Sequence, residues 1–191
     1  MKALGNLPEN YSEYFSVDLQ KNKKQMIFVN LLSFLIAVLM FIPMCFIVPL
    51  EIEITGEALI GLLIKLLAIF ILLVVYIVLH ELVHGIAMKI CGAKKVKYGF
   101  TGLYAFAGSD DYYGKGSYIF IALSPVVLWG AVLAVVSLFV PLSWFWVVHF
   151  VQVVNLSGAA GDLFVTVKFS RFPKDILVRD HGVGMRVYSK S

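Results

Sequence analysis

The sequence predicts an all-α polytopic membrane protein with four transmembrane helices and a short cytoplasmic β-hairpin after the second helix. The chain has 191 residues, of which 60% are hydrophobic and only 15% are charged. A soluble domain of this length would not carry so much apolar sequence. The apolar residues fall into four stretches, each long enough to cross a hydrocarbon core of about 30 Å. Most Lys and Arg residues lie beside alternate ends of these stretches.

The four spans are expected at about 26–50, 58–90, 118–140 and 144–167, within one membrane-embedded domain covering residues 1–191. Residues 1–25 are mostly polar and are expected to form a short amphipathic helix or to lie on the lipid headgroups. The first span has Asn30 as its only strongly polar residue, so we interpret it as a wall and an anchor. It begins too late and is too long for a cleavable signal peptide.

The segment between the second and third spans has a different pattern. Apolar or aromatic residues alternate with basic or small ones over 95–100, and a Thr101–Gly102 pair and a second run at 103–107 follow. Such alternation around a turn predicts a short β-hairpin. Residues 108–116 are expected to form a loop in which Asp110 and Asp111 face water.

The basic residues also predict the topology. The N-terminal segment, the 89–117 segment and the tail carry nearly all the Lys and Arg, and the other two loops carry none. By the positive-inside rule, both termini are expected to be cytoplasmic, in a multi-pass protein of the cell membrane. The lipid bilayer is therefore the expected partner of the basic residues, and a nucleic acid is not. Cys45 and Cys91 are expected on opposite sides of the membrane, which excludes a disulfide between them.

One motif with chemical meaning stands at the end of the second span. Residues 80–85 read HELVHG, an instance of HExxH. On a helix, positions i and i+4 share one face, so His80 and His84 can both present a ring nitrogen to one metal ion. Glu81 lies beside them and can take a proton from a water that the metal activates. The motif therefore predicts a Zn²⁺ site with the chemistry of a hydrolase.

A third protein ligand is expected, because catalytic zinc sites usually have three. The polar candidates are His149, Asp162, His181, Asp110 and Asp111. His80 and Asp162 reach similar depth, since both spans enter from the outside and the two residues lie about 22 and 18 positions in. His149 is roughly 20 Å from Asp162 along a helix axis, so we interpret it as an interfacial histidine. His181 lies in the tail, and the comparison of depths in the membrane does not exclude it as a zinc ligand.

Asp162 is preferred for a second reason. A carboxylate inside a span is costly without a partner, and zinc would be that partner. Residues 157–161 are all small and would let the backbones of two helices approach closely. Asn155 lies seven residues before Asp162, on the same helical face. It could donate a hydrogen bond to the oxyanion of a tetrahedral intermediate or make a helix–helix hydrogen bond, and both alternatives stay open.

These stretches resemble those of site-2 proteases, which are intramembrane zinc metalloproteases. Site-2 proteases carry HExxH in one span and, in a later one, an Asn followed by a Leu-Asp-Gly-like element. The matching residues here are HELVHG at 80–85 and NLSGAAGDL at 155–163, with Ser124–Pro125 as a looser match. The chain lacks the Pro between Asn155 and Asp162, and Asp162 lies between Gly161 and Leu163 rather than between Leu and Gly.

The resemblance implies a role for each matching residue. His80, His84 and Asp162 would be the zinc ligands, Glu81 the base, and Asn155 a neighbour of the oxyanion.

Over its whole length the chain more closely resembles a family of small bacterial membrane proteins of the zincin peptidase type. The shared features are the LPENY opening, the basic segment before the first span, HELVHG, the Asn/Asp stretch and a DHGVG tail at 180–184. This resemblance implies membership of that family.

The sequence thus predicts a membrane-embedded zinc metalloendopeptidase that cleaves peptide bonds near the cytoplasmic membrane face by means of metal-activated water. Its substrate would be a membrane or membrane-proximal protein, which the hairpin could bind by strand addition. The alternative is a non-catalytic membrane zinc-binding or scaffold protein, but a purely structural site has no use for Glu81. A transporter would need polar residues through the depth of the bilayer, and the first and third spans have almost none.

Overall fold

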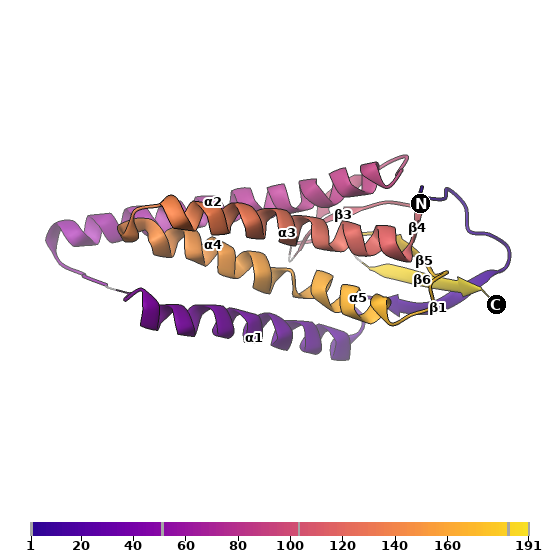
Figure 1. Cartoon of the computed structure of the whole chain (residues 1–191), viewed down its shortest axis with the longest axis horizontal. Helices are drawn as coiled ribbons and strands as arrows, with labels where there is room; N and C mark the ends of the chain where they lie inside the picture. The colour runs from indigo at the N-terminus through magenta and orange to yellow at the C-terminus, as the bar shows by residue number, and fades with distance from the viewer. Residues whose placement is uncertain (1, 51, 103, 183, 191) are drawn as a thin grey trace.

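The computed structural model describes residues 2–50, 52–102, 104–182 and 184–190. Long helices run along the long axis of the molecule, and the strands gather at one end, where both termini also lie (Figure 1). The helices are α1 (Lys23–Ile47), α2 (Gly56–Ile90), α3 (Lys115–Phe139), the 3-10 turn η1 (Leu142–Trp144), α4 (Phe145–Gly158) and α5 (Ala160–Ser170). The strands are β1 (Tyr11–Val17), β2 (Lys97–Phe100), β3 (Ala105–Gly108), β4 (Tyr112–Gly114), β5 (Leu177–Asp180) and β6 (Met185–Lys190).

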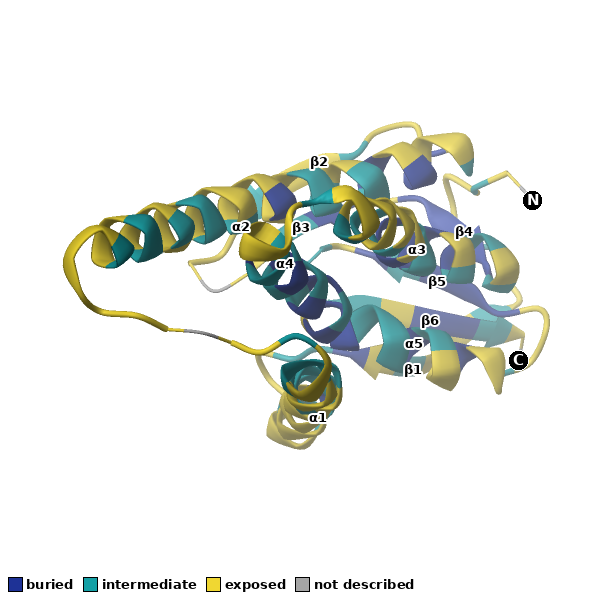
Figure 2. Cartoon of the chain, turned by 60° about the vertical axis from the view of Figure 1, so that its left-hand side comes forward, coloured by how far each residue is buried: buried dark blue, intermediate teal, exposed yellow. Residues whose placement is uncertain are grey.

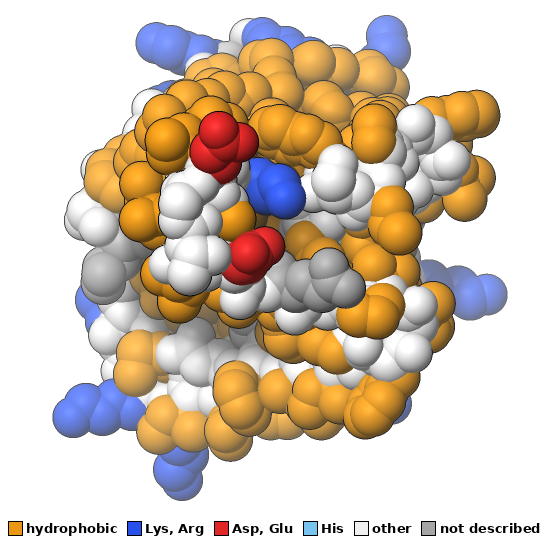
Figure 3. Space-filling model, turned by 90° about the vertical axis from the view of Figure 1, so that its left-hand side faces the viewer, with side chains coloured by type: hydrophobic (Ala, Val, Ile, Leu, Met, Phe, Trp, Pro, Cys, Tyr) orange, Lys and Arg blue, Asp and Glu red, His pale blue; other side chains and the backbone are white. Residues whose placement is uncertain are grey.

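Four helical segments are long and apolar enough to cross a membrane, namely α1, α2, α3 and the segment Leu142–Ser170. They correspond in position to the four predicted spans, so the prediction of four long apolar helical segments is confirmed, and their crossing of a membrane stays a prediction. Their outward side chains are apolar and uncovered: Phe46 is 85% exposed and Leu138 is 80% exposed. Seen from the end opposite the strands, the surface is mostly hydrophobic with few charged side chains (Figure 3). Such a surface is compatible with a multi-pass membrane protein.

The fourth segment is interrupted, although the sequence predicted one continuous helix. α4 ends at Gly158 and α5 begins at Ala160, with Ala159 between them at φ −83° and ψ 16°. The small residues around this point give the helix little side-chain packing to hold it straight. The interruption places Asp162 in the first turn of α5, where the helix dipole favours a carboxylate.

A four-stranded antiparallel sheet at the end of the molecule corrects the all-α prediction. Its strand order is β1-β6-β5-β4, and Tyr11 pairs with Lys190, so the two ends of the chain lie side by side. Residues 11–17 are therefore a strand and not an amphipathic helix, and the predicted loop at 108–116 contains β4. The prediction failed because these strands are short and their partners are far away in sequence, so local periodicity gives little signal.

A second sheet consists of β2 and β3, which pair antiparallel in the region predicted to form a hairpin. The register joins Lys97 to Gly108 and Phe100 to Ala105. The main core lies where the four-stranded sheet meets the helices (Figure 2). It includes Phe169, Val178 and Val187, none of which is exposed to solvent. The core fixes the sheet against the helix ends that carry the HExxH motif and Asp162.

Candidate metal centre

Three side chains from two distant segments meet at one point. His80 and His84 lie one turn apart on α2, and Asp162 reaches them from the first turn of α5. His80 Nε2 is 3.4 Å from one Asp162 carboxylate oxygen, and His84 Nε2 is 3.5 Å from the other. All three side chains are shielded, at 12%, 12% and 22% exposure. The structure brings together the three residues that the sequence suggested as ligands, and their binding of a metal stays a prediction.

This geometry fits a zinc ion. Two ligand atoms at about 2.0–2.1 Å from a tetrahedral zinc are themselves roughly 3.3–3.5 Å apart, which is the separation seen here. The Nδ1 atom of His84 faces the Ile121 carbonyl, which can only accept, so His84 must carry its proton on Nδ1. In the neutral ring, Nε2 presents a lone pair toward a carboxylate, as a metal ligand would. Lone pairs that converge in this way repel each other unless a cation lies between them.

Glu81 lies beside this cluster and contacts the hairpin. The backbone N–H of Ala107 in β3 interacts with the Glu81 carboxylate, and β3 packs against α2. Gly85, the last residue of HELVHG, explains the close approach, because a Cβ there would overlap the Tyr98 hydroxyl. The motif thus provides two candidate metal ligands, the Glu81 carboxylate, and a glycine that lets the Tyr98 side chain of the hairpin lie close to α2.

Comparison with known families agrees with this geometry. Residues 72–177, more than half of the chain, match the family described as "Putative zincin peptidase". The chain belongs to this family. No curated protein and no solved structure matches the chain. The family description suggests a metallopeptidase that uses zinc, and the matched segment contains every member of the metal cluster.

In this zincin family member, the first histidine has a buried partner that sequence reasoning missed. The Tyr76 hydroxyl lies 2.8 Å from His80 Nδ1 and donates a hydrogen bond of 2.9 Å to the Asn155 carbonyl oxygen. The Tyr76 oxygen is then free to accept from His80 Nδ1, which leaves Nε2 for a metal. Residues of this kind commonly orient metal-bound histidines. The sequence signal was available, since Tyr76 precedes His80 by one helical turn.

The second histidine is oriented by a proline. His84 Nδ1 donates a hydrogen bond of 3.0 Å to the Ile121 carbonyl of α3. In a regular helix this carbonyl would accept from the residue four positions later, which here is Pro125 and has no N–H. Pro125 therefore frees the acceptor that His84 uses. This gives a physical role to the Ser124–Pro125 pair noted in the sequence.

Asn155 is completely buried, at 0% exposure. Its side-chain amide oxygen accepts from the Tyr76 hydroxyl, and its amide nitrogen donates to the Val126 carbonyl at 3.4 Å. The helix–helix hydrogen bond considered for Asn155 is therefore present. Its predicted contact with an oxyanion stays a prediction.

The other ligand candidates lie elsewhere in the fold. His149 is buried, stacks on Phe145 and is 3.3 Å from the Met40 carbonyl. His181 lies in the β5–β6 turn, with Nδ1 3.7 Å from Asp110. Asp111 is buried, which corrects the expectation that it faces water, and it accepts from the Lys94 backbone N–H and the Ser109 hydroxyl.

Asp110 is exposed and joins the two sheets. It accepts hydrogen bonds from Lys97 of β2 and Arg179 of β5. These hydrogen bonds lower the pKa of the Asp110 carboxyl to about 2. Asp110 therefore ties the hairpin to the larger sheet electrostatically.

The β5–β6 turn holds the hairpin in place through the DHGVG tail. Gly182 has φ +83°, and a Cβ there would overlap the Phe106 ring of β3. The Asp180 carboxylate accepts from the Gly182 N–H at 2.7 Å and from the Tyr118 hydroxyl at 2.6 Å. Burial raises the pKa of the Asp180 carboxyl. The tail thus places β3 beside Glu81, a role that the sequence alone did not indicate.

Proposed function

We propose that this chain is a membrane-embedded zinc metalloendopeptidase that cleaves peptide bonds near the cytoplasmic membrane face. The observation that carries the proposal is the position of Glu81 beside the His80, His84 and Asp162 cluster. A structural metal site would be complete with ligands alone, whereas hydrolysis also needs a proton acceptor. Membership of the zincin family supports the same chemistry.

Each residue of the site has a separate role in the proposed hydrolysis of a peptide bond. His80, His84 and Asp162 would hold zinc, which supplies an activated water as the nucleophile when bound. Glu81 takes the proton of that water and passes it to the leaving amine. Tyr76 and the Ile121 carbonyl keep both imidazole rings turned toward the ion. Asn155 orients Tyr76, and its proposed contact with the oxyanion belongs to this proposal.

The membrane placement belongs to the proposal as well. The four apolar segments are taken to cross the bilayer with both termini in the cytoplasm, as the distribution of Lys and Arg predicts. The strands gather at the end of the molecule where α5 lies (Figure 1), and the cluster is formed by the last part of α2 and the first turn of α5. Water could reach a site at that depth, and a membrane or membrane-proximal protein could present a peptide bond to it.

The hairpin suggests how a substrate would be held. β3 pairs with β2 along one edge, and the Ala107 N–H shows that its other edge points toward Glu81. An extended peptide laid along this edge would pass the proton acceptor. Replacing Phe100 with Pro, which disturbs the pairing of β2 with β3, should lower turnover while zinc content is unchanged.

The test compares zinc-loaded wild type with Glu81→Gln in detergent, each incubated with peptides released from solubilised membrane proteins and analysed by mass spectrometry. The wild type should produce new peptide ends, and Glu81→Gln should reduce their rate by about 100-fold or more. Both proteins should bind about one zinc per chain. Equal rates would show that Glu81 is not the base. Zinc binding without any cleavage by the wild type would favour the scaffold alternative.

A further inference from the structure

A cavity of about 420 Å³ opens directly beside the metal centre. It is lined by the end of β1 and the segment after it, by α1, by the β2–β3 hairpin, by the end of α4 and the start of α5, and by the β5–β6 turn. Asp162 is part of its wall, so a molecule in the cavity would adjoin one of the three proposed zinc ligands. The volume falls within the usual range for ligand sites.

The lining is apolar or uncharged with one exception. Among the described residues that line the cavity, Asp162 is the only charged one, and it is already assigned to the metal. A cavity of this composition excludes a charged ligand, because burying an unpaired charge is costly. The occupant is therefore uncharged.

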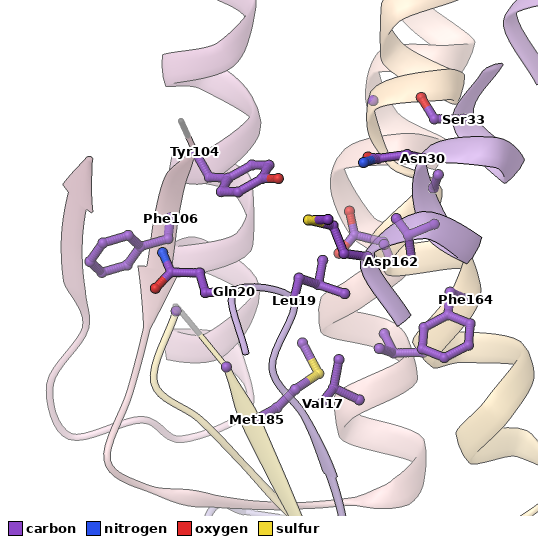
Figure 4. A pocket seen from close by; sticks show the side chains of 18 of the residues that line it. Val17, Leu19, Gln20, Asn30, Ser33, Tyr104, Phe106, Asp162, Phe164 and Met185 are labelled. Atoms are coloured by element: carbon purple, nitrogen blue, oxygen red, sulfur yellow. The ribbon is translucent and has the colours of Figure 1, made fainter. Parts of the chain in front are cut away.

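Two polar side chains on α1 face this cavity. Asn30 and Ser33 lie one turn apart, and both line it. Figure 4 shows the Asn30 amide and the Tyr104 ring projecting toward each other from opposite sides of the cavity. No hydrogen bond of the Asn30 or Ser33 side chain is found within the described part of the chain. Leaving such groups unpaired next to a bilayer is unfavourable, and an acyl chain could not pair with them.

The small residues before Asp162 keep the cavity open. The sequence suggested that they allow two helices to approach closely, but a Cβ added at Gly161 would meet no atom within 4 Å. Gly158 and Gly161 both line the cavity instead. At Gly161 the missing side chain leaves space that no described residue fills, and at Gly158 a Cβ would meet only Val154, at 3.8 Å.

We propose that this cavity binds an uncharged, extended segment of the substrate chain, and that Asn30 is a substrate-binding residue that hydrogen-bonds the backbone of that segment. An amide offers both a donor and an acceptor, which is what a peptide unit needs once its helical hydrogen bonds are broken. A helix must unwind before its peptide bonds reach a metal, and inside a membrane the freed N–H and C=O groups need partners. This inference rests on the proposed peptidase function.

The test measures binding, so that it does not depend on cleavage. Zinc-loaded Glu81→Gln protein in lipid nanodiscs is titrated with a fluorescent synthetic peptide of about 20 Leu and Ala residues, interrupted by Gly-Ser-Gly near its cytoplasmic end. An uninterrupted Leu/Ala peptide serves as the comparison. The interrupted peptide should bind more tightly, because its backbone unwinds more easily.

Two pairs of variants are made in the Glu81→Gln background. Asn30→Leu keeps the side-chain size but removes the amide, and it should weaken binding of the interrupted peptide about five- to tenfold. Its control is Leu31→Ala, on the same helix but 62% exposed and outside the cavity lining. Gly161→Leu fills the cavity and should abolish binding. Its control is Gly61→Leu on α2, where a Cβ also meets nothing within 4 Å.

The results of this experiment distinguish the substrate-binding proposal from the peptidase proposal. Binding by Asn30→Leu equal to that of the parent, or no binding of the peptide by the parent, would overturn the proposal and leave the cavity to lipid. Equal losses in the control variants would also overturn it, because the effect would then be general to the helices. Failure of the peptidase proposal appears elsewhere, as absence of cleavage by the wild type with Glu81 intact. Zinc content is measured for each variant, and Asn30→Leu should leave it unchanged.

Discussion

The metal centre has two sides that are built in different ways. The ligand side consists of α2 and α5 with His80, His84 and Asp162. The hairpin side consists of β2, β3 and the β5–β6 turn, which bring backbone groups toward Glu81. The ligand side is held by helix geometry and by hydrogen bonds to Tyr76 and the Ile121 carbonyl. The hairpin side is held by contacts between segments far apart in sequence.

The difference suggests that the ligand side determines zinc binding and that the hairpin side affects activity. Changes on the ligand side should alter zinc binding first and activity as a consequence. Changes on the hairpin side should alter activity while zinc stays bound, because none of the residues there belongs to the metal cluster. Zinc content and turnover, measured together, therefore separate the two sides.

The largest expected effect is on the ligand side. Asp162→Ala should lower zinc affinity by more than about 100-fold, because it removes a direct ligand and leaves two histidines. His149→Ala is the control: it also removes a buried polar side chain, but one whose partner is the Met40 carbonyl. Elemental analysis of the purified proteins should show zinc lost only in the Asp162 variant. If the Asp162 variant retained zinc, the third ligand would have to be another residue.

Pro125→Ala should have a smaller effect on the same side. The new N–H at position 125 competes with His84 for the Ile121 carbonyl, so zinc affinity should fall about 3- to 10-fold. Tyr76→Phe should act comparably on His80. Competition with a fluorescent chelator measures both variants. Unchanged affinity in both would show that these hydrogen bonds do not orient the ligands.

Gly182→Ala tests the hairpin side. A methyl group there would overlap the Phe106 ring, and the backbone at φ +83° disfavours any residue with a Cβ. Turnover should fall to roughly a tenth of the wild-type rate, with zinc content unchanged. Gly102→Ala has the same kind of backbone cost at φ +90°, but meets no atom within 4 Å, and should leave turnover near normal.

Loss of zinc in the Gly182 variant would contradict the division between the two sides. Recovery of turnover on adding Phe106→Ala to Gly182→Ala would sharpen it, since the steric conflict is then removed.

The smallest expected effect concerns the pH dependence of the hairpin attachment. The pKa of Asp110 is lowered to about 2 by hydrogen bonds from Lys97 and Arg179, against roughly 3.9 in an unfolded chain. A lowered pKa means that the ionised form stabilises the fold above the unfolded value, and that this contribution is lost as the pH falls through about 2. The difference in melting temperature between wild type and Asp110→Asn should be constant near pH 8, where the neighbouring His181 is neutral, and shrink below about pH 4. A difference that grew on acidification below about pH 4 would contradict this sign.

Much of the ligand side could be predicted because its signals are local. His80 and His84 lie four residues apart, which places them on one helical face whatever the rest of the fold. Asp162 could be paired with them because the spans set its depth. The partners of the two histidines were harder to find: the Tyr76 spacing could have been noticed, but the carbonyl freed by Pro125 reaches His84 only in the folded packing.

The hairpin side shows the opposite case. The sequence suggested strands near 95–107 but did not connect them to the DHGVG tail or to the N-terminal segment. Nothing local indicates that Gly182 lies against Phe106 or that Tyr11 pairs with Lys190. The break at Ala159 and the cavity beside Asp162 also depend on which surfaces the folded helices leave uncovered.

By itself, the sequence determined the apolar helices and the two segments that carry the candidate metal ligands, because hydrophobic length and helical spacing are properties of contiguous residues. The tertiary structure alone decided what surrounds those candidate ligands: the orientation of each histidine, the strand beside Glu81 and the open space in front of α1. Those features arise from pairs of surfaces that meet only on folding, and neither member of a pair shows its partner in its own sequence.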